Sequence, residues 1–184
     1  MKPLNIGLCG FGGQGIILSA VILGTTAVTK CNLYAVQTQS YGSEARGGQC
    51  QAEIIISDKP INSPISEKKD ILIALFQSAL VKYIPTLKSD GILIIDPMLV
   101  NDTKSITARI LEIPATEIAI NLGNRLATNM VVLGFLQEAT KLFGRDDLLE
   151  VVKESVAPKY LDLNVMAVDA GIAYAKERNI TLEV

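Results

Sequence analysis

The chain has 184 residues, of which 49% are hydrophobic and 20% charged, a composition that suits one globular domain with ample core material. A net charge of −2 without a long basic run argues against nucleic-acid binding, and no apolar stretch reaches the roughly 18 residues of a membrane span. Histidine is absent, which removes the commonest general base and most transition-metal sites.

The most informative segment is the first one. An apolar run over residues 4–9 predicts a buried strand, and the segment Gly-Phe-Gly-Gly-Gln-Gly follows it at residues 10–15 with glycines at the G-x-G-x-x-G positions. A helical apolar pattern then begins at Ile16 and continues to about Val28. Strand, glycine turn and helix in this order are typical of a phosphate-binding loop, where the helix N-terminus offers N–H groups to an anion. The alternative is that the glycines only allow helix and strand to pack closely.

This glycine loop does not predict an NAD site. A dinucleotide site normally carries an acidic residue about 20 residues beyond the glycines, at the end of the second strand. The second strand is predicted over residues 32–37, and neither Asp nor Glu occurs between Gly15 and Ser43. The residue that would anchor the ribose is therefore missing.

The rest of the chain alternates apolar strand patterns with helical ones. Pro60 and Pro64 mark a surface loop, and residues 89–91 predict a turn before a buried strand. The expected strands cover residues 49–57, 70–75, 92–95 and 105–113, and the expected helices cover residues 76–87, 125–143, 145–156 and 164–177. This order predicts an α/β, Rossmann-like, largely parallel sheet with helices on both faces and C-terminal helices packed on it, all within one domain over residues 1–184.

A second unusual loop, Tyr-Gly-Ser-Glu-Ala-Arg-Gly-Gly, covers residues 41–48. In a doubly wound sheet, loops at the carboxyl ends of strands line the ligand crevice. Arg46 could hold a phosphate or carboxylate in a bidentate fork, and Glu44 could orient Arg46 or receive a bond from a partner chain. The alternative is a turn with an ordinary surface ion pair. Together the two loops predict these cofactor-binding residues: Gly10, Gly12, Gly13, Gln14, Gly15, Tyr41, Glu44 and Arg46.

Four short segments in order resemble the gamma subunit of 2-oxoacid:ferredoxin (acceptor) oxidoreductases. They are the G-x-G-G-Q-G loop at residues 10–15, the Y-G-x-E-x-R-G-G loop at residues 41–48, the I-S-x-x-P-I segment at residues 56–61 and the N-M-V-x-L-G segment at residues 129–134. The second loop is most similar to the 2-oxoglutarate type, because pyruvate-type chains tend to carry phenylalanine at the Tyr41 position and indolepyruvate-type chains lack the acid at the Glu44 position.

The resemblance implies one subunit of a larger enzyme that converts 2-oxoglutarate and CoA to succinyl-CoA and CO₂. It places thiamine diphosphate, Mg²⁺ and iron–sulfur clusters on alpha, beta and ferredoxin-like partner subunits, with no catalytic residue here. The residues agree, since Cys9, Cys31 and Cys50 form no C-x-x-C pair. The alternatives are a stand-alone nucleotide- or acyl-CoA-binding module and a gamma subunit for pyruvate, ketoisovalerate or indolepyruvate.

From the residues themselves we expect the two loops to form an anion site for the phosphates of the co-substrate CoA, which fits better than NAD because the ribose-anchoring acid is absent. The alternative is that the second loop is only a contact between subunits.

The chain start and composition add expectations about the chain's surroundings. The first residues run directly into a strand, so no signal peptide is expected, and a cytoplasmic location follows. We expect Cys9 and Cys31 to be buried thiols of a reducing compartment. A mean hydropathy of +0.34 is high for a globular chain, which predicts a surface shared with partner subunits and self-association when the chain is isolated.

Overall fold

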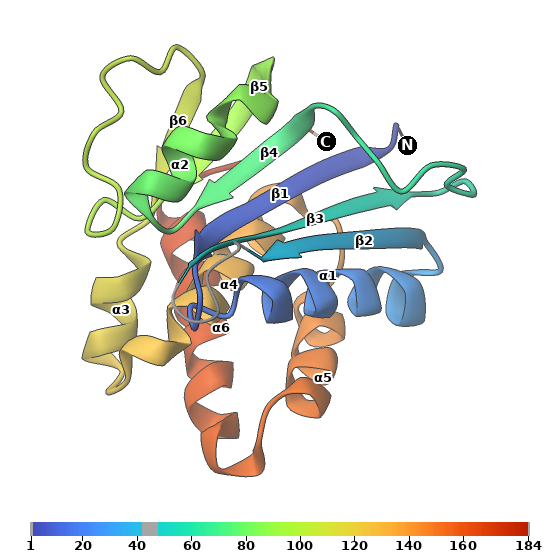
Figure 1. Cartoon of the computed structure of the whole chain (residues 1–184). Coiled ribbons are helices and arrows are strands. Elements are labelled where there is room, and N and C mark those ends of the chain that lie inside the picture. Colours follow the sequence, from blue (N-terminus) through green and yellow to red (C-terminus); the bar gives the residue numbers. More distant parts are fainter. Residues whose placement is uncertain (1, 42–47, 184) are drawn as a thin grey trace.

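A computed structural model describes residues 2–41 and 48–183 of the chain, in which strands and helices alternate before the chain ends in helices (Figure 1). The strands are β1 (Leu4–Phe11), β2 (Tyr34–Tyr41), β3 (Gln49–Ser57), β4 (Lys69–Ala74), β5 (Leu87–Ile95) and β6 (Arg109–Glu112). The helices are α1 (Ile16–Cys31), α2 (Gln77–Tyr83), α3 (Ala115–Asn121), α4 (Thr128–Thr140), α5 (Arg145–Ser155) and α6 (Leu161–Glu177).

The described strands form one sheet in the order β2-β3-β1-β4-β5-β6. β3 runs antiparallel to both of its neighbours, and the pairings β1–β4, β4–β5 and β5–β6 are parallel. The prediction of a largely parallel α/β sheet is therefore confirmed. Five strands end at the same side of the sheet, which we call the carboxyl edge; it is marked by Phe11, Tyr41, Ala74, Ile95 and Glu112.

Helices cover both faces of this sheet, as the sequence predicts. Leu4, Ile6 and Leu8 alternate along β1 toward the face that α1 covers. On this face α4 and α5 pack against α1, and α6 packs against α4 (Figure 1). Cys9 of β1 belongs to the opposite face, where α2 completes a second and smaller core with Leu72 of β4. α1 and α2 thus follow β1 and β4 onto opposite sides of the sheet.

The expected turn at residues 89–91 is wrong, because these residues continue β5. The pairing of β4 with β5 shifts register there: Lys69 faces Leu87, whereas Ile71 faces Ile92, so β5 takes up extra residues in a bulge. A Cβ atom on Gly91 would lie 3.1 Å from the carbonyl oxygen of Asp70. Glycine here allows two backbones to approach and does not mark a turn.

Other element boundaries also differ from the sequence prediction. The helix expected over residues 76–87 ends at Tyr83 and gives way to a 3₁₀ turn that contains Pro85, because proline supplies no N–H group to continue the helix.

The helix α1 runs to Cys31, where Asn32 ends it in a left-handed conformation. The second strand therefore starts at Tyr34, later than expected. The strand expected over residues 105–113 shortens to β6, and the helix expected over residues 125–143 divides into a 3₁₀ turn and α4.

Among the described residues, no helix combines the length and the apolar character needed to cross a membrane.

Candidate functional site

The glycine loop joins β1 to the N-terminus of α1 at the carboxyl edge. Gly13 and Gly15 have φ angles of 95° and 73°, in the left-handed region that favours glycine. The N–H groups in the first turn of a helix have no acceptor within the helix, and Gly15, the N-cap of α1, provides no side chain to accept from them. A Cβ atom on Gly13 would meet no atom within 4 Å. One side of the loop is therefore open beside a helix N-terminus that favours an anion.

The side chain of Gln14 closes the opposite side of this loop. Its Oε1 atom accepts a hydrogen bond from the N–H of Phe11 at 2.6 Å, and its Nε2 atom donates to the carbonyl oxygen of Leu75 at 2.8 Å. The carboxamide thus bridges the ends of β1 and β4, and the Phe11 and Phe76 rings lie 5.1 Å apart over the same ends. Because β1 and β4 lead to helices on opposite faces, this gap is the switch point where doubly wound sheets bind ligands. Here the chain's own side chains fill it.

Two of the loop glycines are explained by packing. A Cβ atom on Gly10 would lie 2.5 Å from Oε1 of Gln14, and one on Gly15 would lie 2.4 Å from Nδ2 of Asn129. Gly10 therefore makes room for the Gln14 bridge, and Gly15 lets the loop approach α4. This agrees with the packing alternative for these two positions, whereas the open side of Gly13 leaves the anion-binding alternative available there.

The two loops singled out by the sequence meet at the carboxyl edge. The N–H of Gly12 donates to the carbonyl oxygen of Gly48 at 3.1 Å, which ties the glycine loop to the last residue of the second loop. Tyr41 is the last residue of β2, and Glu44 and Arg46 lie outside the described residues. Because β3 is inserted between β1 and β2, the end of β2 is two strand spacings, about 10 Å, from β1. This arrangement differs from a dinucleotide site, in which the second strand lies next to the first.

A pocket of about 300 Å³ opens beside the free side of the glycine loop. Gly13 and Gly15 form one wall, and segments at the N-terminal ends of α4 and α6 form the others. Three carboxamides, from Asn124, Asn129 and Asn164, lie among apolar side chains such as Leu18 and Leu163. An apolar cavity with a few convergent polar groups and a helix N-terminus is suited to an elongated organic ligand that carries an anionic group.

The sequence-based site includes only Gly13 and Gly15 of this pocket, and Asn129 is the omitted residue that contacts the glycine loop. It is 4% exposed, and its Nδ2 atom donates to Oγ of Ser19 at 3.4 Å. The N-M-V-x-L-G segment contains it, but the sequence gives that segment only as a mark of resemblance. The segment also ends at Gly134, where a Cβ atom would lie 2.0 Å from the carbonyl oxygen of Val168 in α6. Its asparagine therefore contacts the glycine loop, and its glycine allows two helices to touch.

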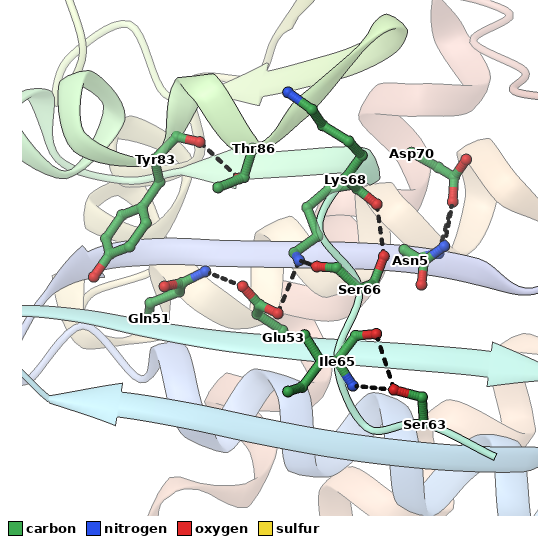
Figure 2. Close-up of polar contacts among 11 residues, drawn as sticks. Asn5, Gln51, Glu53, Ser63, Ile65, Ser66, Lys68, Asp70, Tyr83 and Thr86 are labelled. Atoms are coloured by element: carbon green, nitrogen blue, oxygen red, sulfur yellow. Dashed lines mark hydrogen bonds and ion pairs between the residues drawn. The ribbon is translucent and has the colours of Figure 1, made fainter. Parts of the chain in front are cut away.

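A second polar cluster lies on the sheet face at the start of β4, away from the carboxyl edge. The Nζ atom of buried Lys69 lies 2.8 Å from Oε2 of Glu53 and also donates to the carbonyl oxygen of Ser66. Figure 2 shows Glu53 with Gln51 beside it on β3, and the segment with Ser66 crossing over the sheet. The cluster joins that segment to the sheet, which is a structural role.

The thiols do not form a metal centre. Cys9 and Cys50 are buried in the two different cores on opposite faces of the sheet, and burial raises the pKa of the Cys9 thiol well above its ordinary value. Cys31 is partly exposed, so the expectation that it is buried is wrong. The three sulfur atoms cannot converge on one iron–sulfur cluster. Across the part of the chain that the structure describes, no group of three Cys, Asp or Glu side chains could hold a metal ion.

Comparison with known proteins identifies relatives along nearly the whole chain. The family model for pyruvate ferredoxin/flavodoxin oxidoreductase matches residues 5–174. The 2-oxoglutarate synthase subunit KorC of Methanothermobacter thermautotrophicus is 42% identical over 174 residues, covering 91% of this chain and 92% of that protein.

Solved structures agree with this comparison. The gamma subunit of a keto/oxoacid ferredoxin oxidoreductase from Geobacter sulfurreducens superposes with a TM-score of 0.86 at 31% identity, covering 96% of this chain and 98% of that one. The 2-oxoglutarate:ferredoxin oxidoreductase from Magnetococcus marinus, solved with 2-oxoglutarate, coenzyme A and succinyl-CoA bound, shares the fold with a TM-score of 0.85 at 24% identity. There the match covers 96% of this chain but 32% of the longer one.

Proposed function

Because this chain belongs to the pyruvate ferredoxin/flavodoxin oxidoreductase family, we propose that it works as the gamma subunit of a 2-oxoglutarate:ferredoxin (acceptor) oxidoreductase. The complex oxidatively decarboxylates 2-oxoglutarate with CoA, giving succinyl-CoA and CO₂ and passing electrons to the acceptor. The observation that carries this proposal is the 42% identity to a 2-oxoglutarate synthase subunit of matching length.

The family membership confirms the resemblance expected from the four segments of the sequence. It also favours the oxidoreductase subunit over a stand-alone nucleotide- or acyl-CoA-binding module. The 2-oxoglutarate type is favoured over the pyruvate, ketoisovalerate and indolepyruvate types, in agreement with Tyr41 and Glu44 in the second loop.

The side chains of this subunit indicate which cofactors bind to its partner subunits instead. Cys9 and Cys50 lie on neighbouring strands but face opposite sides of the sheet, and Cys31 lies at the far end of α1, so the three thiols do not form a cluster site and iron–sulfur clusters belong on a ferredoxin-like partner. Thiamine diphosphate and Mg²⁺ belong on alpha and beta partner subunits in the cytoplasm. When bound there, thiamine supplies the stabilisation of the carbanion that decarboxylation needs, and this chain contributes binding and orientation as one gamma-type domain over residues 1–184.

The isolated chain is expected to show no 2-oxoglutarate oxidation, even with thiamine diphosphate, Mg²⁺, CoA and a viologen dye as acceptor. The same assay with the co-expressed complex is expected to reduce the dye, and to do so faster with 2-oxoglutarate than with pyruvate. Turnover by the isolated chain would contradict the subunit assignment, and a preference of the complex for pyruvate would contradict the substrate assignment.

We propose further that the two loops bind the phosphate groups of CoA at the carboxyl edge. Three observations support this: the bond from Gly12 to Gly48 that joins the loops, the open side of Gly13 and the pocket beside it. In this proposal Gly10 and Gln14 shape the loop through their packing, and Gly13 and Gly15 present the helix N-terminus to the anion. Tyr41, Glu44 and Arg46 complete the site from the second loop.

Arg46→Ala in the assembled complex is expected to raise the KM for CoA about tenfold or more, because a hydrogen bond to a charged group contributes about 1.5–3 kcal/mol. The KM for 2-oxoglutarate should hardly change, since that substrate reacts on another chain. Steady-state kinetics of the purified complex measure both constants. The matched control is Arg109→Ala, which removes an exposed arginine from the start of β6, at the sheet end opposite the carboxyl edge. Weakened assembly with an unchanged KM for CoA would show that the loop is a subunit contact instead.

A further inference from the structure

The outer side of α1 and strand β2 belong to a segment, residues 16–41, with almost no charge. The chain as a whole is 20% charged, yet this segment, which makes up α1 and β2, contains one charged residue, Lys30. The Nζ atom of Lys30 lies 2.6 Å from Oε1 of Glu150 in α5, so that charge is already paired within the chain. Charged side chains are depleted from the central parts of protein interfaces.

β2 is an edge strand without the features that normally protect an edge. It lies at the end of the sheet and pairs with β3 on its inner side from Tyr34 to Tyr41 without a bulge. Between these two residues the strand contains no charged residue and no proline, and no side chain of residues 34–40 is fully buried. Exposed edges are usually blocked by lysine, proline, a bulge or a covering element, because their free N–H and C=O groups otherwise pair with another chain.

The outer side of α1 continues this surface. Val21 and Val28 are 41% and 50% exposed there, one helical repeat of seven residues apart. Together with Gly24 and Thr25 they line a shallow hollow of about 340 Å³ whose floor includes Ala35 of β2. Small residues between two exposed valines allow another chain to approach the helix closely.

We propose that the outer side of α1 and the β2 edge form the permanent interface with the thiamine-binding partner subunit; this inference rests on the proposed function. The fold of this chain matches 32% of a longer chain in the Magnetococcus marinus enzyme, so the fold can exist joined permanently to further polypeptide. Permanent interfaces are larger and more hydrophobic than transient ones, which fits an uncharged surface of this kind.

The reaction chemistry selects the thiamine-binding subunit over a second copy of this chain. The acyl group must reach the thiol of CoA, so the chain that binds thiamine must lie beside the CoA site proposed at the carboxyl edge. β2 ends at that edge with Tyr41, and the next described residue, Gly48, bonds to the glycine loop. A partner seated on β2 therefore borders the CoA site directly, whereas a second copy in that place would bring no thiamine to it.

The test is co-expression of the tagged chain with the other subunits of its complex, as wild type and as the double variant Val21→Glu/Val28→Glu. We expect recovery of the thiamine-binding subunit to fall at least tenfold, because each glutamate places an unpaired charge in the interface. Val81→Glu is the matched control: Val81 is 65% exposed on α2, on the other face of the sheet, and recovery should equal wild type. The melting temperature of each isolated variant shows that it is folded.

Each outcome has a separate meaning. If the wild-type chain recovers no partner subunit, the proposed function itself fails. If wild type and the double variant recover the partner equally, the interface proposal is overturned. A third outcome also overturns the proposal: the isolated wild-type chain is a dimer, the double variant is a monomer, and both recover the partner subunit equally. The outer side of α1 would then bind a second copy of this chain. Hydrogen exchange of the wild-type chain is the second measurement: amides of residues 34–40 should be slower in the complex than alone, and an unchanged rate counts against the proposal.

Discussion

Gly171→Ala is expected to lower the free energy of unfolding by about 3 kcal/mol or more, the upper range for overpacking a core. A Cβ atom on Gly171 would lie 1.9 Å from the carbonyl oxygen of Val131, and one on Gly134 would lie 2.0 Å from that of Val168. These contacts are with helix backbone, which cannot rotate away as a side chain can. α4 and α6 would have to separate, and every residue of α4 is buried. Urea unfolding of the isolated chain, followed by circular dichroism, measures the change.

Gly24→Ala in α1 is the control for this experiment. The atom nearest to a Cβ on Gly24 is the terminal Cδ1 of Ile54 at 3.0 Å, which can shift, and alanine is favoured in a helix by about 1 kcal/mol. We expect the stability to change by less than about 1 kcal/mol in either direction. Equal effects of Gly24→Ala and Gly171→Ala would contradict the close contact between α4 and α6.

The sequence predicts the first unit of the fold well because the signals for it are local. The apolar run before Gly10, the glycines at positive φ and the helical periodicity from Ile16 each depend on residues a few positions apart. The sequence does not predict that β3 inserts antiparallel between β1 and β2. Side chains alternate with a period of two in parallel and antiparallel strands alike, so the pattern over residues 49–57 identifies a strand but neither its neighbours nor its direction.

The candidate site shows the same division between local and distant information. Gln14 attracts attention because it lies within a glycine loop, but its role depends on Leu75, 61 residues further along the chain. Asn129 reaches Gly15 only because α4 packs beside α1. Neither contact follows from spacing in the sequence. The contributions of Tyr41, Glu44 and Arg46 to ligand binding stay predictions, with Arg46→Ala as their direct test.

The ion pair of Lys69 and Glu53 is the second place where one substitution should have a large effect. The Lys69 side chain is 2% exposed and that of Glu53 is 23% exposed, so the lysine charge depends on its partners within the chain. The lysine stem also lies over Gly7, where a Cβ atom would approach Cγ of Lys69 to 3.3 Å. Figure 2 shows the partners of this pair, with Gln51 next to Glu53 and Ser66 on the segment that crosses the sheet.

Lys69→Met is expected to lower the free energy of unfolding by about 3 kcal/mol, since removing one partner of a buried ion pair leaves the other charge uncompensated. The value lies at the lower end of the known range because Glu53 keeps some contact with water. Glu53→Gln alone should also destabilise, because it leaves the lysine charge buried. The double variant should be more stable than the sum of the single losses predicts, by about 1 kcal/mol or more. Urea unfolding of the four proteins completes this double-mutant cycle, and losses that simply add would show that Lys69 and Glu53 do not interact.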